Sequence, residues 1–256
     1  MAWRIFLIIS MCYAMGWLIS LGMAGGILVN ALSGLNYHLG MSVIMFVCVS
    51  YTLLGGLRAV IATDFVQTII ILLGVITIAF LVIDNIGFET LHENLQQEHP
   101  MLLSLVFPAA IMFLFNNLFF GVGEIFHSNV WWSRAFAFRV NTGTKAYLIG
   151  GLLWLPIPVV AGFIALAAPS MGLIVPSADM VGPMVAGQIL GTTGAVIVFI
   201  VIFSALASSL DSLLAATSDL ITQDLYRGHI NKGASDDHCY KVSKYIILGL
   251  GLLTWL

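Results

Sequence analysis

Two acidic residues lie in strongly apolar stretches of the sequence, Asp64 and Asp211. A carboxylate is costly inside a membrane and is usually retained there for a function. Ser208, Asp211 and Ser212 are spaced i, i+3 and i+4, so on a helix they share one face. Carboxylate and hydroxyl oxygens together suit a hard cation such as sodium. The spacing therefore predicts a cation site on this helix.

Each acid also has an interpretation that needs no ion. Asp64 is placed to open a helix, where an N-cap or first-turn acid interacts favourably with the helix dipole. The serines near Asp211 can bond to carbonyls of their own helix, with the acid facing a watery cavity. Both interpretations stay open from these residues alone.

The elements that must position these residues are membrane helices. The chain has 256 residues, of which 60% are hydrophobic and 8% charged, and its mean hydropathy is +1.05. Soluble domains carry roughly 25% charged residues. There is no basic stripe, so we expect no nucleic-acid partner. The cysteines and histidines form no ligand spacing, so we expect no metal other than sodium. No nucleophile–base pair or phosphate loop is present, so we do not expect an enzyme.

Seven apolar runs are long enough to span a bilayer, which takes about 20 residues. The last run has no polar boundary, so we expect the natural protein to continue and residues 1–256 to be a truncated transmembrane domain. The runs cover residues 5–29, 39–57, 64–83, 101–122, 146–168, 186–216 and 242–256.

The basic residues predict the orientation of these helices. Threaded through the membrane, the seven helices place all nine Lys and Arg residues on one side, and that side is cytoplasmic by the positive-inside rule. The opposite loops, 30–38, 84–100 and 169–185, hold acids but no Lys or Arg. We therefore expect a multi-pass protein of a plasma or bacterial inner membrane, with cytoplasmic loops at 58–63, 123–145 and 223–243.

Three ordered motifs resemble the sodium/solute symporter family, whose members carry proline, pantothenate, sialic acid, sugars and urea. Residues 51–67, YTLLGGLRAVIATDFVQ, are similar to its signature. Residues 132–135, WSRA, are similar to the loop after its sixth core helix. Residues 205–226, ALASSLDSLLAATSDLITQDLY, are similar to its sodium-site helix.

The resemblance implies the fold and the ion sites. The fold is an all-α, five-plus-five inverted-repeat transporter core, of which this chain holds core helices three to nine. Ala205, Ser208 and Ser209 match the main sodium site. A second cation or proton site matches Asp64, Ser208, Asp211 and Ser212. Several relatives have Ser in place of Asp211, so a carboxylate there favours either tighter sodium binding or a proton.

The solute site is less clearly marked. The helix at 101–122 and the residues just after it supply Asn116, Asn117 and Glu124 as polar groups for an otherwise apolar pocket, and Tyr13 is a weaker candidate. The two asparagines can equally join neighbouring helices by amide hydrogen bonds. An ordinary packed aromatic is the alternative for Tyr13.

The function that the resemblance implies is sodium-coupled symport of a small organic solute across the lipid bilayer by alternating access. Residues 169–225 favour a urea-like solute, and an amino acid is the other expectation. Sodium is the expected coupling ion, and a proton is the alternative. The alternative function is the membrane solute-sensing half of a signalling protein built on the same core.

Residues 1–256 alone should not transport solute, because half of the main sodium site would come from a helix that precedes them in the family. The measurement is sodium-driven uptake by vesicles that contain only this chain. Robust uptake would contradict the expectation of a truncated domain.

Overall fold

The computed structural model describes residues 2–104, 106–139 and 141–255, and within them it is helical, without a strand. The predicted all-α class is confirmed. Among the described residues, five helical segments are apolar and long enough to cross a membrane, and they cover residues 3–33, 37–86, 108–127, 143–170 and 181–230.

The chain forms two compact units. The first comprises residues 1–70, 127–138 and 202–256, and the second comprises residues 71–126 and 139–201. The acidic and hydroxyl residues that the sequence assigns to cation binding all belong to the first unit.

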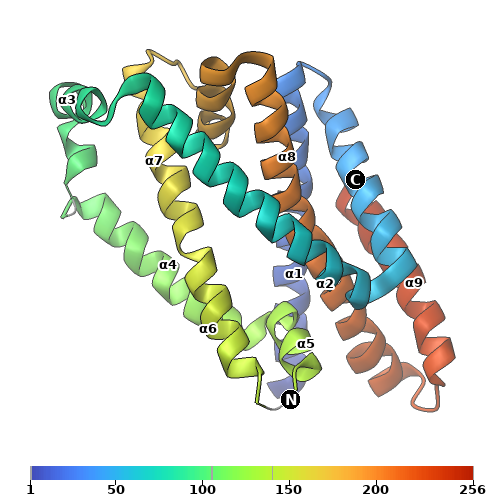
Figure 1. Ribbon diagram of the computed structural model, residues 1–256. Coiled ribbons are helices and arrows are strands. Elements are labelled where there is room, and N and C mark those ends of the chain that lie inside the picture. The colour runs from blue at the N-terminus through green and yellow to red at the C-terminus, as the bar shows by residue number, and fades with distance from the viewer. Residues whose placement is uncertain (1, 105, 140, 256) are drawn as a thin grey trace. The chain divides into compact units, whose positions relative to one another are not determined.

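Four helices build the apolar core of the first unit (Figure 1). They are α1 (Ala2–Ser33), the first part of α2 (Tyr37–Ile86), the end of α8 (Val181–Leu220) and α9 (Asp236–Trp255). Apolar side chains from all four are buried together, which removes them from water or lipid and fixes the helices side by side. The central members are Leu18, Ile44, Leu210, Leu214 and Leu250.

Helix α2 bends sharply at one residue, Gly56, which has φ 53° and ψ −149° (Figure 1). This conformation is almost restricted to glycine, because a Cβ atom would clash with the backbone. The two helices predicted at 39–57 and 64–83 are therefore joined without a loop. The prediction that residues 58–63 form a loop is wrong, since these residues are helical beyond the bend.

The other two predicted cytoplasmic loops also contain helix. Within 123–145 lie the end of α4 (Pro108–His127), α5 (Asn129–Ala137) and the start of α6 (Gly143–Trp154). Within 223–243 lie most of a π-helix, η3 (Ile221–Ile230), and the start of α9. Arg227 Nη1 lies 2.8 Å from Asp236 Oδ1, in an exposed ion pair that links η3 to the start of α9.

The second unit contains α4, α6, α7 (Pro156–Ser170) and a helix that the sequence did not predict, α3 (Phe88–Glu98). Leu91 and Leu95 of α3 are buried, and the ring of Phe88 stacks on Phe163 of α7 at 6.2 Å. The spacing of these apolar residues is that of one helix face. Two 3-10 turns, η1 (Pro100–Leu103) and η2 (Ala178–Met180), complete the connections of this unit.

Gly56→Ala should lower the free energy of unfolding by about 1–3 kcal/mol, because alanine is strained at this backbone conformation. The measurement is thermal unfolding of the whole protein in detergent. Gly16→Ala in α1 is the control, since an added Cβ there meets nothing within 4 Å. Equal melting temperatures for the two variants would contradict the role of Gly56.

Candidate cation-binding site

The carboxylate of Asp64, beyond the bend of α2, receives hydrogen bonds from three side chains. Ser208 Oγ donates to Oδ1 at 2.5 Å and Ser212 Oγ donates to Oδ2 at 3.3 Å. Arg134 Nη2 pairs with Oδ2 at 3.0 Å, and the Arg134 and Asp64 side chains are only 20% and 22% exposed. The charge of Asp64 is therefore balanced and its oxygens are hydrogen-bonded, as a largely buried carboxylate requires.

Asp211 meets a different partner. It is fully buried, and its Oδ2 accepts a hydrogen bond from the hydroxyl of Tyr51, which precedes the bend of α2. Its Oδ1 has no hydrogen-bond partner within the described ranges. Successive residues of an α-helix are rotated by about 100°, so Asp211 and Ser212 point in clearly different directions. Of the four residues predicted to share one site, the structure brings Asp64, Ser208 and Ser212 together and turns Asp211 toward Tyr51.

The bend at Gly56 is what allows both halves of α2 to reach the same part of α8. Tyr51 and Asp64 are 13 residues apart, which is roughly 20 Å along a straight helix at 1.5 Å per residue. Their α8 partners, from Ser208 to Ser212, span little more than one helical turn. A straight α2 would therefore place only one of the two side chains against this turn.

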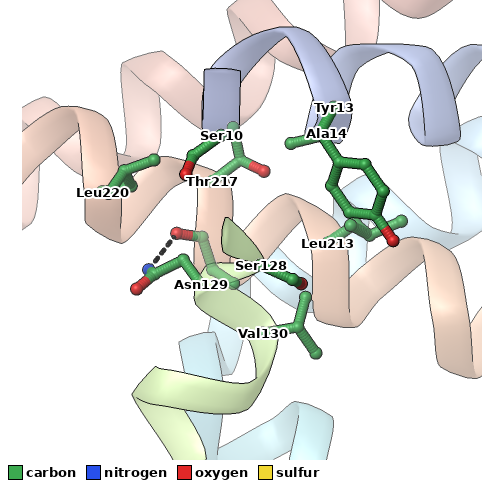
Figure 2. Close-up of a pocket in the computed structure, with 10 residues that line it drawn as sticks. Ser10, Tyr13, Ala14, Ser128, Asn129, Val130, Leu213, Thr217 and Leu220 are labelled. Carbon is green, nitrogen blue, oxygen red and sulfur yellow. Dashed lines mark hydrogen bonds between the residues drawn. The ribbon is translucent and has the colours of Figure 1, made fainter. Parts of the chain in front are cut away.

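Helix α5 carries Arg134 and is attached at its first turn to α8 (Figure 2). Asn129 Nδ2 donates to the carbonyl of Ala216 at 2.8 Å. Ser10 Oγ donates to the carbonyl of His127, just before α5, at 2.6 Å. From this anchored end, Arg134 extends to Asp64 and also donates to Ser212 Oγ at 2.6 Å.

The recess drawn in Figure 2 lies beside this anchor and includes Tyr13. Its volume of about 10 Å³ is room for one water molecule. The Tyr13 ring packs edge-on against His127, with the ring centroids 4.4 Å apart. This recess is too small for an organic solute, so its polar groups act in joining α1, α5 and α8.

The residues matched to the main sodium site lie on consecutive turns of α8. Ser208 is half-buried and turned to Asp64, Ala205 is half-buried, and Ser209 is exposed. Of these three residues, Ser208 is the one that contacts Asp64, and it belongs to both predicted ion sites.

The predicted solute residues of α4 belong to the second unit. Asn116 and Asn117 are exposed and Glu124 is half-buried. The amide of Asn117 donates to the carbonyl of Phe113, one turn earlier in its own helix, at 2.8 Å.

Two residues of the site were not predicted from the sequence. Arg134 was attributed to membrane orientation alone, and Tyr51 was noted only as part of a motif. The signal for Arg134 was available, because a carboxylate inside a membrane needs a positive partner, and Arg134 stands in the second family-like motif. For Tyr51 no signal existed, since its meeting with Asp211 depends on how far α2 bends.

The oxygens in this part of α2 and α8 are of the chemical type that a sodium ion binds. Asp64 supplies a carboxylate, Ser208 and Ser212 supply hydroxyls, and Oδ1 of Asp211 on the same turn of α8 is buried without a hydrogen bond among the described residues. Hard cations prefer such a set of oxygen ligands.

Comparison with known proteins finds one matching family and several similar transporters. The sequence profile of the Sodium:solute symporter family matches residues 3–256. The chain is 27% identical to the "Urea-proton symporter DUR3" of Oryza sativa subsp. japonica, over 90% of this chain and 36% of the relative. It is 28% identical to the "Urea active transporter" of Saccharomyces cerevisiae, over 90% and 35%. It is 26% identical to the "Osmoregulated proline transporter OpuE" of Bacillus subtilis, over 91% and 48%.

A solved structure is similar in fold. It is a Na⁺-coupled sialic acid symporter in a substrate-bound, outward-open state, with a TM-score of 0.79 and 20% identity. The likeness covers 98% of this chain and 57% of that one. The predicted transporter-core fold is confirmed by it. The chain spans between about a third and a half of the length of the curated relatives it matches.

Tyr51→Phe should lower the free energy of unfolding by about 1–3 kcal/mol, because it removes a hydrogen-bond donor from a fully buried carboxylate. Thermal unfolding of the whole protein measures this. Tyr245→Phe, at an α9 residue that is 75% exposed, is the control. If both variants unfold like the wild type, the Tyr51–Asp211 bond does not stabilise the fold.

Proposed function

The chain belongs to the Sodium:solute symporter family, and from that premise we propose that the whole protein couples sodium movement to uptake of a small organic solute. Family membership also makes it a carrier rather than an enzyme and, with the five apolar helical segments, an integral multi-pass membrane protein. The observation that carries the ion coupling is the cluster of Asp64, Ser208 and Ser212.

This cluster has the properties expected of a coupling site. It joins α2 to α8, so an ion held there would stabilise one arrangement of these two helices over others. It lies among apolar segments, where a carboxylate is seldom retained without a role. Ser208 is also part of the matched main sodium site, with Ala205 and Ser209. Asp211 lies on the same turn and adds a second carboxylate.

A urea-like solute is the first candidate, and an amino acid such as proline is the second. Two relatives are named as urea transporters and one as a proline transporter. The residues proposed for solute contact remain Asn116, Asn117 and Glu124 of α4, with their two amides and one carboxylate. Such groups match the hydrogen-bonding carbonyl and amino groups of either solute.

The experiment is uptake of labelled urea and labelled proline by cells that express the complete parent gene, in sodium or in potassium. We expect uptake to require sodium. Asp64→Asn and Asp211→Asn should each raise the sodium concentration needed for half-maximal uptake by about ten- to a hundredfold, since a charged oxygen ligand is lost.

Asp237→Asn is the control, because Asp237 is an exposed acid at the start of α9. Uptake that follows an external acid gradient and ignores sodium would contradict sodium coupling and assign the role to protons. Absence of uptake of both solutes would favour the solute-sensing alternative.

A further inference from the structure

The guanidinium of Arg134 and the proposed cation use the same oxygens. Arg134 Nη2 binds Asp64 Oδ2 at 3.0 Å and Ser212 Oγ at 2.6 Å. From these contacts we propose that Arg134 competes with the cation for Asp64 and Ser212, so that cation binding releases α5. This inference rests on the proposed function, because it assumes that a cation binds at Asp64.

The hydrogen-bond capacity of the cluster supports competition rather than sharing. Oδ2 of Asp64 already accepts from Ser212 and Arg134, and a carboxylate oxygen has about two lone-pair positions. The Ser212 hydroxyl donates to Asp64 and accepts from Arg134, and its residue is only 5% exposed. Ser212 Oγ keeps one lone pair, but Asp64 Oδ2 keeps none, so a cation that binds Oδ2 must replace the contact of Arg134 or that of Ser212.

The charges at the site also favour competition between Arg134 and the cation. Arg134 and Asp64 form a neutral pair that is mostly shielded from solvent. A cation added beside the pair would leave an excess positive charge next to a guanidinium, and like charges at close range repel strongly where the dielectric constant is low. Departure of Arg134 restores neutrality, with the cation as the new partner of Asp64.

Release would affect only the last turn of α5, because its first turn is held by other contacts. Its first turn is tied to α8 by Asn129, and Val130 packs against the apolar core of the first unit. Its last turn is exposed at Phe136, which is 84% accessible, and Arg134 links this turn to α2 and α8 by an ionic contact and a hydrogen bond. Loss of that contact would free the last turn of α5 while its first turn stays in place.

The consequence is a link between the cation site and a segment on the predicted cytoplasmic side. The cation lowers the affinity of α5 for its docked position, and docking lowers the affinity for the cation by the same factor. Arg134 is thus a residue that sets cation affinity without being a cation ligand.

The test is equilibrium binding of ²²Na⁺ to the purified whole protein, with no solute present. Arg134→Gln should tighten sodium binding by at least about tenfold, since it removes a charged competitor. Arg134→Lys should lie between this variant and the wild type, because lysine keeps the charge but lacks the planar fork of donors. Arg139→Gln, an exposed arginine two residues after α5, should bind like the wild type.

Weaker or unchanged sodium binding by Arg134→Gln would overturn the proposal, because Arg134 would then support the site or be irrelevant to it. Failure of the wild type to bind sodium would instead overturn the proposed sodium coupling itself, and with it the competition.

Hydrogen exchange of residues 129–137 gives a second measurement that does not depend on binding affinity. Sodium, compared with potassium, should speed amide exchange in α5 of the wild type, because its last turn is released. In Arg134→Gln the exchange should be fast in both salts. Slower exchange of α5 in sodium would contradict the release.

Discussion

The bend of α2 at Gly56 is the constraint on which the site depends. One residue with a positive φ allows a single helical segment to approach α8 twice, with Tyr51 on one side of the bend and Asp64 on the other. The two carboxylates of the site, Asp64 and Asp211, are satisfied by groups that only this geometry brings within reach. The second glycine of the paired glycines in the first motif, Gly56, is thus explained by backbone conformation.

The electrostatics of the site follow from its apolar surroundings. A carboxylate in apolar surroundings needs a positively charged or hydrogen-bonding partner, and the two acids have different partners. Asp64 has an arginine and two hydroxyls, which are exchangeable contacts, whereas Asp211 has a tyrosine hydroxyl from the neighbouring core helix. The first arrangement suits an ion that is bound and released. The second joins α2 to α8 through Oδ2 of Asp211 and leaves its Oδ1 without a hydrogen bond among the described residues.

Much of the fold was predictable because membrane helices are marked by length and apolarity. Each of the seven predicted segments is largely helical over its described residues. The short helices α3 and α5 were not predicted, because each is too short to give a membrane signal and depends on contacts from distant parts of the chain. Asp64, Ser208 and Ser212 were predictable as a group from residue type and motif. Arg134 could have been inferred as the positive partner of a membrane carboxylate. Tyr51 could not, since no spacing in the sequence encodes a bend angle.

The central claim is that Asp64 and Ser208 hold the same cation. The most direct test is a double-mutant cycle in the free energy of sodium binding to the whole protein, with Asp64→Asn, Ser208→Ala and the double variant. If both residues bind one ion, the double variant should lose little more affinity than Asp64→Asn alone. Fully additive losses would show that the two residues act on sodium independently and would contradict a shared site.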